Sequence, residues 1–442
     1  MFYLPRETEL TKELLYKMIT KFRTSVEPQL VSYKQYFDGN QEILKKAYAD
    51  TSKPCSRLVV NYCANIVGSF TGYLATPGHI SYQSDDDIED IMNILRYNDY
   101  QEQDANLLQD ALTYGVAAEL MYIDDKSQTR FRNINPTTCF GIYDDSLTAD
   151  LIYFVRMYKV NNWEYTDTYR VDVYSDYDIK HYTMSGKTGA LSFEGEEPHF
   201  FSQVPANIMV LEDEKSIFDC ILTLQDGYNQ LISAELDEFN SFADAYLALI
   251  GVDAEADDIA AMKENRVLLL PQDASAQWVT KAANDAQVEN MLKRLQDAIY
   301  KIAQCPDFSS ESFVGGVSSG IAIQYRLTGM ETRAGKIEAI MKKALQRRIE
   351  IICGIASLKI GEEVFRDIKI EFKRNIPEDI TTTINLVNSL KGSVSDATLL
   401  SQLSFIDDVN TELEALQEQR AANMAVYGFG AFGAENNEEV DE

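Results

Sequence analysis

The chain changes from a helical to a strand-like residue pattern in its first third and returns to a helical pattern near its middle. From Val116 to about Val210, short runs rich in Tyr, Val, Ile and Phe are separated by turn signals such as Asn135-Pro136 and Asp144-Asp145. These runs predict antiparallel strands, arranged as a meander or a small sandwich. Residues 1–75 and about 86–114 read as helical. The pattern predicts an α+β fold that is mostly helical.

Two predicted helices flank a small module in the second half of the chain. The apolar residues of 216–249 recur at helical spacing. The segment 285–305 begins with a capping-box pattern, and its apolar residues stop before a proline. Between the helices, residues 250–284 contain an acidic stretch and an apolar run, Val267 to Leu270, that predicts a strand.

The remaining segments alternate between irregular and regular patterns. Residues 306–320 contain three glycines and five serines, which predict a flexible loop. A long helix is expected to follow, ending at about Cys353, and then a strand from Ile368 to Phe372. Polar helices are expected over 378–430, and the acidic residues of 431–442 predict a disordered tail.

The charge of the chain excludes one class of function. Lys and Arg number 40 and Asp and Glu number 70, so the formal net charge is −30. A surface of this sign repels phosphate at long range, which argues against a repressor or a protein that coats DNA. It still permits a protein that touches DNA without holding it.

One predicted helix departs from this acidic composition. Residues 321–350 contain seven basic residues against three acidic ones. We interpret them as a solvated face or as ion pairs to a neighbouring subunit, with contact to phosphate as the alternative. The basic residues are Arg326, Arg333, Lys336, Lys342, Lys343, Arg347 and Arg348.

Catalytic and metal-binding patterns are weak. Gly316 to Gly320 matches the G-x-S-x-G nucleophile elbow, but in α/β-hydrolases the catalytic His follows the Ser, and all three histidines here precede Ser318. A serine hydrolase that uses Ser318 remains an alternative. Isolated histidines and six cysteines without a C-x-x-C pair offer no metal site, and no cofactor is expected. The chain is therefore expected not to be an enzyme.

Two further features bear on location. The cysteines are expected to be free, as in a protein that folds in a reducing cytoplasm. Residues 58–84 lack charged side chains, but polar residues interrupt the segment and Pro77-Gly78 ends it early. It predicts a buried helix rather than a membrane span.

Short motifs occur in a distinctive order along the chain. In this order they resemble the portal proteins of tailed bacteriophages, specifically the type found in siphophages of Gram-positive hosts, and the resemblance runs from about Tyr36 to Glu418. The matching pieces are Tyr36 to Gln41, Lys53-Pro54 through Asn61, Gly72 to Leu74, Tyr114 to Ala117, Asn135-Pro136, Asp226 to Asn229 with Ser233, Phe242 to Tyr246, Pro306 to Phe308, Ser319 to Ala322, Asn375 to Asp379 and Ser395 through Asp408.

The resemblance implies a structural role in the virion. Family members form a ring, usually of twelve subunits, at one capsid vertex, where it nucleates capsid assembly and serves as the head-tail connector platform. A terminase motor drives double-stranded DNA through the ring, and the genome is later ejected through it. The expected partners are other copies of the chain, the DNA, the terminase large subunit, the major capsid and scaffolding proteins and a head-completion adaptor protein. The resemblance also implies that no membrane is involved and that assembly takes place in the host bacterial cytoplasm.

The resemblance also assigns regions to the chain. The implied regions are a wing (1–215), a stem helix (216–249), a clip (250–284), a second stem helix (285–305), a tunnel loop (306–320), a wing return with a long kinked helix and a strand (321–377), a crown (378–430) and the acidic tail (431–442).

An acidic scaffold protein that forms no ring remains the structural alternative to a portal protein.

DNA-facing residues are expected in two of the implied regions. The tunnel-loop residues are Asp307, Phe308, Ser309, Ser310, Glu311, Ser312, Phe313, Val314, Gly315 and Gly316. The channel-lining candidates on the polar side of the second stem helix are Lys293, Arg294, Asp297 and Lys301.

Overall fold

A computed structural model of the chain contains two compact units. The first unit comprises Met1–Gly316 and Tyr325–Arg374, and the second comprises Val317–Gln324 and Asn375–Glu442. The structure describes residues 2–50, 53–160, 168–186, 189–242, 246–250, 275–279, 285–309, 320–355, 364–375, 385, 387–400, 403 and 409–428.

Helices dominate the first part of the chain, as predicted. Thr11 and Asn61 cap two of them, because each side-chain oxygen accepts a hydrogen bond from a backbone N–H three residues later. The helical segments are α1 (Lys12–Lys21), the π-helical turn η1 (Phe22–Val26), α2 (Glu27–Phe37), the 3-10 turn η2 (Glu42–Lys45), α3 (Tyr62–Leu74), α4 (Glu89–Tyr97) and α5 (Tyr100–Tyr114). The uncharged segment contains α3, which is largely buried, as expected.

The strand-rich block forms two sheets. The strands are β1 (Phe2–Tyr3), β3 (Val116–Ile123), β4 (Thr129–Ile134), β5 (Cys139–Tyr143), β6 (Leu151–Lys159), β7 (Thr168–Tyr174), β8 (Asp178–Ser185), β9 (Leu191–Pro198) and β10 (Ala206–Val210), with a 3-10 turn η3 (Pro136–Thr138) before β5. One sheet has the order β1-β5-β6-β7-β8-β9 and the other β10-β3-β4. Apart from the parallel pair β1 and β5, neighbouring strands are antiparallel.

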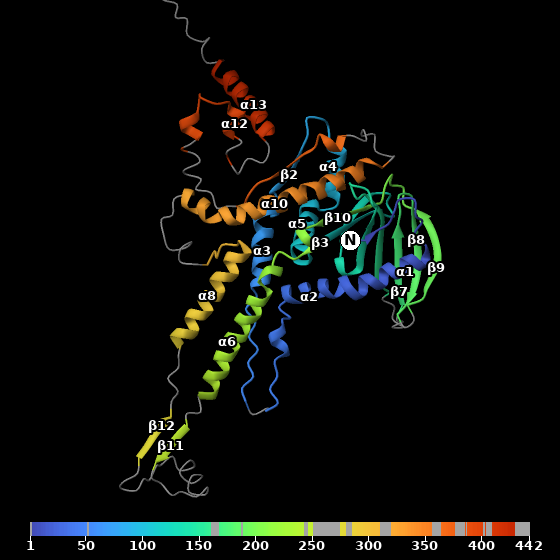
Figure 1. Ribbon diagram of the computed structural model, residues 1–442. Helices are drawn as coiled ribbons and strands as arrows, with labels where there is room; N and C mark the ends of the chain where they lie inside the picture. The colour runs from blue at the N-terminus through green and yellow to red at the C-terminus, as the bar shows by residue number, and fades with distance from the viewer. Residues whose placement is uncertain are drawn as a thin grey trace, which may run out of the picture. The chain divides into compact units, whose positions relative to one another are not determined.

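An apolar cluster lies on each face of the six-stranded sheet. Successive residues of a strand point to opposite faces, and Phe154 and Val155 of β6 accordingly belong to different apolar clusters. Phe154 packs with Leu120 and other residues of the three-stranded sheet, which makes the two sheets a small sandwich. Val155 packs with residues of α1 and α2, the two helices that run along the sheet in Figure 1.

Two helices joined through a β-hairpin follow the sandwich. The elements are the 3-10 turns η4 (Glu212–Glu214) and η5 (Asp219–Ile221), α6 (Leu222–Phe242), β11 (Tyr246–Ile250), β12 (Ser275–Val279), α8 (Asp285–Ala303) and α10 (Gly320–Cys353). β11 and β12 pair antiparallel. α6 packs against α8, and the two helices lie side by side in Figure 1.

The predicted helix over 216–249 is wrong at both ends. Its start forms the 3-10 turn η5, and Tyr246–Ile250 forms strand β11. The reason is that a short apolar run has no period that separates helix from strand, whereas pairing with Ser275–Val279 satisfies its backbone. The strand predicted at Val267 to Leu270 lies outside the described residues.

The last elements confirm one predicted strand and add one. β13 (Lys369–Phe372) lies within the predicted segment and pairs antiparallel with β2 (Ile80–Gln83), which sequence reasoning missed. A 3-10 turn, η6 (Val364–Arg366), precedes β13. The second unit contains α12 (Asp396–Leu400) and α13 (Val409–Gly428), where Arg420 lies 3.6 Å from Asp396. The predicted disordered tail, 431–442, lies outside the described residues.

Candidate functional site

α8 carries the channel-lining candidates and has three faces of different character. Its buried face includes Ile299 and Ala303, both 0% exposed, where the helix packs near α6 and η5. Beside it runs an apolar stripe that is open to solvent, with Met291 51% and Ile302 48% exposed. The helix turns about 100° per residue, so these two side chains lie almost on one line along the axis.

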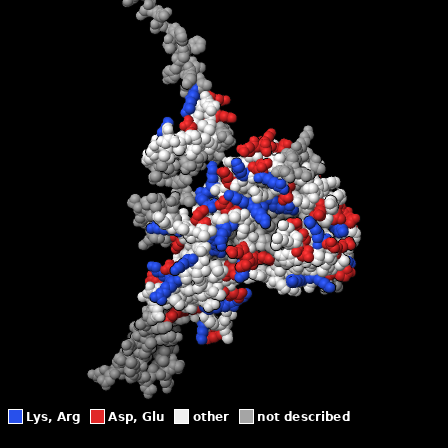
Figure 2. All heavy atoms as spheres, turned by 45° about the horizontal axis from the view of Figure 1, so that its top comes forward, with Lys and Arg blue, Asp and Glu red and all other residues white. Residues whose placement is uncertain are grey.

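The third face of α8 is polar and contains the four candidates. Lys293, Arg294, Asp297 and Lys301 are all exposed. Asp297 and Lys301 follow Lys293 at steps of four residues and Arg294 is adjacent to Lys293, so all four lie within about 100° on one side of the helix, roughly opposite the buried face. In Figure 2, basic side chains gather on the left of the described surface, in the region of α8. Three cations and one carboxylate thus share a solvent-facing stripe in a chain whose net charge is strongly negative.

The start of the predicted tunnel loop is anchored to α8. Asp307 accepts a hydrogen bond from Nε2 of Gln296 (3.0 Å) and two more from the backbone N–H and the hydroxyl of Ser309 (3.0 and 2.6 Å). Phe308, between them, is 45% exposed. The side chain of Asp307 therefore fixes the direction in which the chain leaves the helix. The other predicted loop residues, Ser310 to Gly316, and Ser318 lie outside the described residues.

The basic residues of α10 correct the interpretation of that helix. Arg348 is 0% exposed, and its guanidinium donates to the carboxylates of Asp104 on α5 and Glu119 on β3. Both carboxylates are buried, and the guanidinium lies 4.4 Å from the ring centre of Phe131. Burial raises the pKa of Asp104, and Arg348 opposes that rise. Arg348 is thus a core residue, neither solvated nor available to another subunit.

Two further arginines near this helix bind within the same chain. Arg333 donates to the carbonyl oxygens of Ala303, at the end of α8, and Ile217, each at 2.6 Å. Arg374, just after β13, pairs with Glu331 and Glu338 of α10. Counting charges along a helix does not reveal which of its faces is buried, and this is why the interpretation was wrong for Arg333 and Arg348. Lys336 and Lys343 are exposed, as expected.

A row of polar side chains along α6 holds an extended segment that precedes α3. The four residues, here called the polar ladder, are Gln225, Asn229, Ser233 and Asp237, and each is at most 8% exposed. Each accepts a hydrogen bond from a backbone N–H, three of them in the extended segment and the fourth at the first residue of α3. The pairs are Tyr62 to Gln225 (3.1 Å), Val60 to Asn229 (2.9 Å), Leu58 to Ser233 (3.0 Å) and Ser56 to Asp237.

The ladder works because two repeats match. Four residues of α-helix rise about 6 Å and two residues of extended chain about 6.6 Å, so every fourth side chain of α6 meets every second N–H. The Asp237 end of the ladder is charged, because Nζ of Lys46 lies 2.6 Å from Oδ2 of Asp237. Burial raises the pKa of Asp237, but the hydrogen bonds from Lys46 and Ser56 outweigh it and leave this pKa below its usual value. The polar spacing was the available signal, although the sequence reading used only Asn229 and Ser233, as part of the resemblance.

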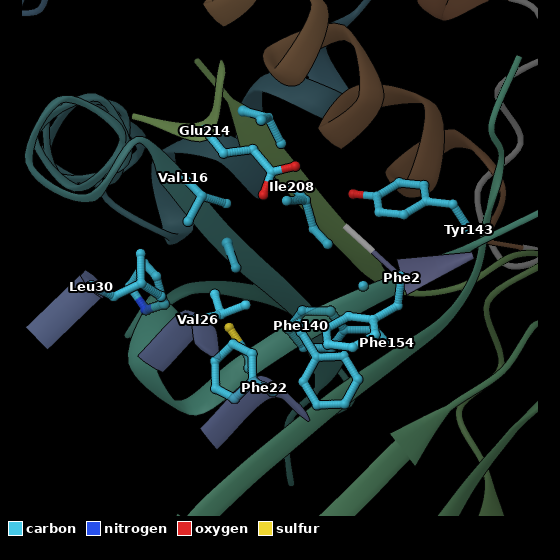
Figure 3. A pocket seen from close by; sticks show the side chains of 15 residues that line it. Phe2, Phe22, Val26, Leu30, Val116, Phe140, Tyr143, Phe154, Ile208 and Glu214 are labelled. Carbon is cyan, nitrogen blue, oxygen red and sulfur yellow. The ribbon is translucent and has the colours of Figure 1, made fainter. Parts of the chain in front are cut away.

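One small pocket among the described residues has a largely apolar lining. The pocket, of about 60 Å³, lies between η1, β5 and β10, and Figure 3 shows that its labelled lining is mostly apolar, with the Tyr143 hydroxyl and the Glu214 carboxylate as polar groups. Within the described part of the chain, no group of three or more His, Cys, Asp or Glu residues is placed to hold a metal ion. Over the same residues, no helix has the length and apolarity needed to cross a bilayer.

Comparison with known proteins decides the family. The family model described as "Phage portal protein, SPP1 Gp6-like" matches residues 24–425. The chain belongs to this phage portal protein family. It is also similar to the portal protein of Bacillus phage SPP1, with 21% identity over 365 residues, which cover 77% of this chain and 69% of that protein.

Membership confirms the resemblance inferred from the ordered motifs. Membership gives this chain a portal role in a phage head. The portal family is structural rather than enzymatic. The match includes α6, α8 and α10 and therefore every residue of the polar ladder and of the polar face of α8.

Proposed function

We propose that twelve copies of this chain form a ring at one vertex of the capsid and that double-stranded DNA passes through it. DNA would enter during packaging and leave during ejection, with the ring as a passive wall. The proposal is carried by the portal family match over residues 24–425. The proposal requires no catalytic step by this chain, since the terminase motor would supply the energy for moving the DNA.

The proposed regions follow the order of elements. Residues 1–215 and 321–377 form the wing, α6 and α8 the stem, the module with β11 and β12 the clip, and 378–430 the crown. What supports the stem and clip is that two contacting helices flank a hairpin. The terminase large subunit would dock on the clip and a head-completion adaptor would replace it, while capsid and scaffolding proteins would surround the ring. Assembly would take place in the host cytoplasm.

The polar face of α8 and the loop after it are the proposed DNA-facing surface. Each copy contributes Lys293, Arg294, Asp297 and Lys301, a net charge of +2 on an exposed stripe. Each tight phosphate contact adds to the retaining affinity for DNA. A few basic side chains on a predominantly acidic protein would therefore guide the DNA without holding it. Exposed Phe308 would contribute bulk to the tunnel loop (306–320), whose proposed DNA-facing residues extend from Asp307 to Gly316.

Ring formation can be tested on the purified protein. Negative-stain imaging is expected to show particles with a central opening, and mass photometry a species of about twelve times 50.0 kDa. A single species of 50.0 kDa without an opening would exclude the ring and leave the acidic scaffold alternative. Deleting Ser309 to Val314 then tests the tunnel loop, because an intact ring with unchanged DNA packaging would contradict its assignment.

A further inference from the structure

Phe200 combines backbone strain with an exposed side chain. Its φ is +65°, in the left-handed region where a non-glycine residue is strained. The residue is 70% exposed, so burial within the described chain does little to offset this strain. Strained residues persist where the surrounding structure holds them, and they concentrate at functional sites.

The residues on either side hold Phe200 in this conformation. His199 is 6% and Phe201 4% exposed, so both flanks are anchored in the core. Nδ1 of His199 accepts a hydrogen bond from the N–H of Phe201 (3.1 Å), and Nε2 therefore donates to the carbonyl of Ser175 (2.9 Å). With both neighbours directed inward, the ring of Phe200 is directed outward.

Two more exposed apolar side chains lie at the same end of the six-stranded sheet. Leu147 is in the turn between β5 and β6, and Tyr177, 77% exposed, is in the turn between β7 and β8. The N–H of His199 donates to the carbonyl of Tyr177 (3.4 Å), which joins that turn to the Phe200 segment. We call Leu147, Tyr177 and Phe200 the sheet-end surface.

Acidic residues accompany each part of this surface. Asp145, Asp176 and Glu197 are exposed and lie within three residues of Leu147, Tyr177 and Phe200 respectively. In Figure 2, acidic side chains are prominent at the right-hand edge, on the side of β8 and β9. One cation also reaches this end of the sheet. Nε of Arg6 lies 3.9 Å from Oδ2 of Asp144, and its Nη2 lies 3.8 Å from Oδ2 of Asp150.

We propose that the sheet-end surface binds an arginine-bearing basic segment of a partner protein. The face of an aromatic ring attracts a guanidinium group, and neighbouring carboxylates add charge complementarity. This chain already uses that geometry internally, with Arg130 4.6 Å from the ring centre of Tyr97. The acidic surroundings disfavour a nucleic acid partner. The proposal does not depend on ring formation.

The test uses a fluorescent peptide of five Arg-Gly repeats and the full chain at 150 mM salt, where long-range attraction is screened. The anisotropy of the peptide is measured with the wild type, Phe200→Gly and Tyr177→Ser. Neither substitution changes the net charge of the chain. We expect Phe200→Gly to raise the melting temperature, because glycine tolerates this φ, and to weaken binding about fivefold. Tyr177→Ser is expected to weaken binding without the gain in stability. The matched control is Ser127→Gly, an exposed position with φ +58° in another turn, which is expected to leave binding unchanged.

Three outcomes would overturn the proposal. The first is wild-type affinity in both Phe200→Gly and Tyr177→Ser. The second is equal affinity for a citrulline-Gly peptide of the same length, which would indicate an apolar partner. The third is a change in the association of copies in Phe200→Gly, seen by mass photometry, with unchanged peptide affinity, which would make the surface a contact between copies.

Discussion

At the scale of single residues, buried charge in this chain is stable only because it is paired. Arg348 balances Asp104 and Glu119, and the hydroxyl of Tyr82 donates to Asp104 (2.9 Å). These groups come from α10, α5, β3 and β2, so one cation links four elements. Removing it would leave two carboxylates away from water with no counter-charge.

Arg348→Met is therefore expected to destabilise the chain by about 3–5 kcal/mol. The measurement is the urea midpoint of the purified protein. Arg347→Met is the matched control, because Arg347 is half-buried on the same helix and pairs with Glu350 (2.7 Å), so its loss should cost under about 1 kcal/mol. Equal midpoints for the two variants would contradict the role given to Arg348.

His199 predicts a dependence of stability on pH. Burial holds its pKa below the usual 6.5, and the Ser175 carbonyl and the carboxylates of Asp178 and Asp176 oppose this only in part. As the pH falls below about 6.5, the unfolded chain binds a proton that the folded chain resists, so the free energy of unfolding decreases. His199→Asn retains an acceptor but does not titrate. We expect the urea midpoint to drop more between pH 7.5 and 5.5 in the wild type than in this variant, and equal drops would refute the prediction.

At the scale of elements, the polar ladder sets the register between α6 and the chain that enters α3. Asn229 is one of its two inner members, accepting from the N–H of Val60 and donating to the side chain of Gln41. Because the ladder repeats along both partners, the loss of one rung leaves its neighbours in place. The cost is then the unpaired groups at that rung.

Asn229→Leu is expected to cost about 2–4 kcal/mol, because the N–H of Val60 and the amide of Gln41 lose buried partners. Gln230→Leu is the control, since Gln230 is exposed on the next position of the helix and should change stability by under about 0.5 kcal/mol. Thermal unfolding of both variants provides the comparison. A melting temperature for Asn229→Leu within error of the control would show that the ladder is not needed for stability.

Elements were predictable where a local pattern determines them. The bounds of α8 follow from its capping box and the proline after it, and the sandwich strands follow from runs rich in Tyr, Val, Ile and Phe that turns interrupt. β11 was missed because its partner residues lie 25 to 33 positions away in sequence, and β2 because it pairs with β13 from the far end of the first unit. The burial of Arg348 was missed for the same reason, since its two carboxylates are on distant elements.

At the scale of the whole molecule, α8 offers two surfaces for two different purposes. Its polar stripe is hydrated when it faces water and carries charges that can meet DNA phosphates, whereas Met291 and Ile302 expose apolar area that association would bury. In a ring, each copy must present one surface to a neighbour and another to the opening. We therefore expect the apolar stripe to contribute to contacts between copies and the polar stripe to contact DNA.

Paired substitutions separate these two purposes. Met291→Gln with Ile302→Gln is expected to weaken association by about tenfold or more, because each contact between copies loses apolar burial. Lys293→Gln with Lys301→Gln removes two cations and should leave the ring intact while reducing the salt dependence of DNA binding. Mass photometry measures association, and circular dichroism shows whether the subunit stays folded. If the lysine pair disrupts the ring and the apolar pair does not, the two faces of α8 have been assigned the wrong way round.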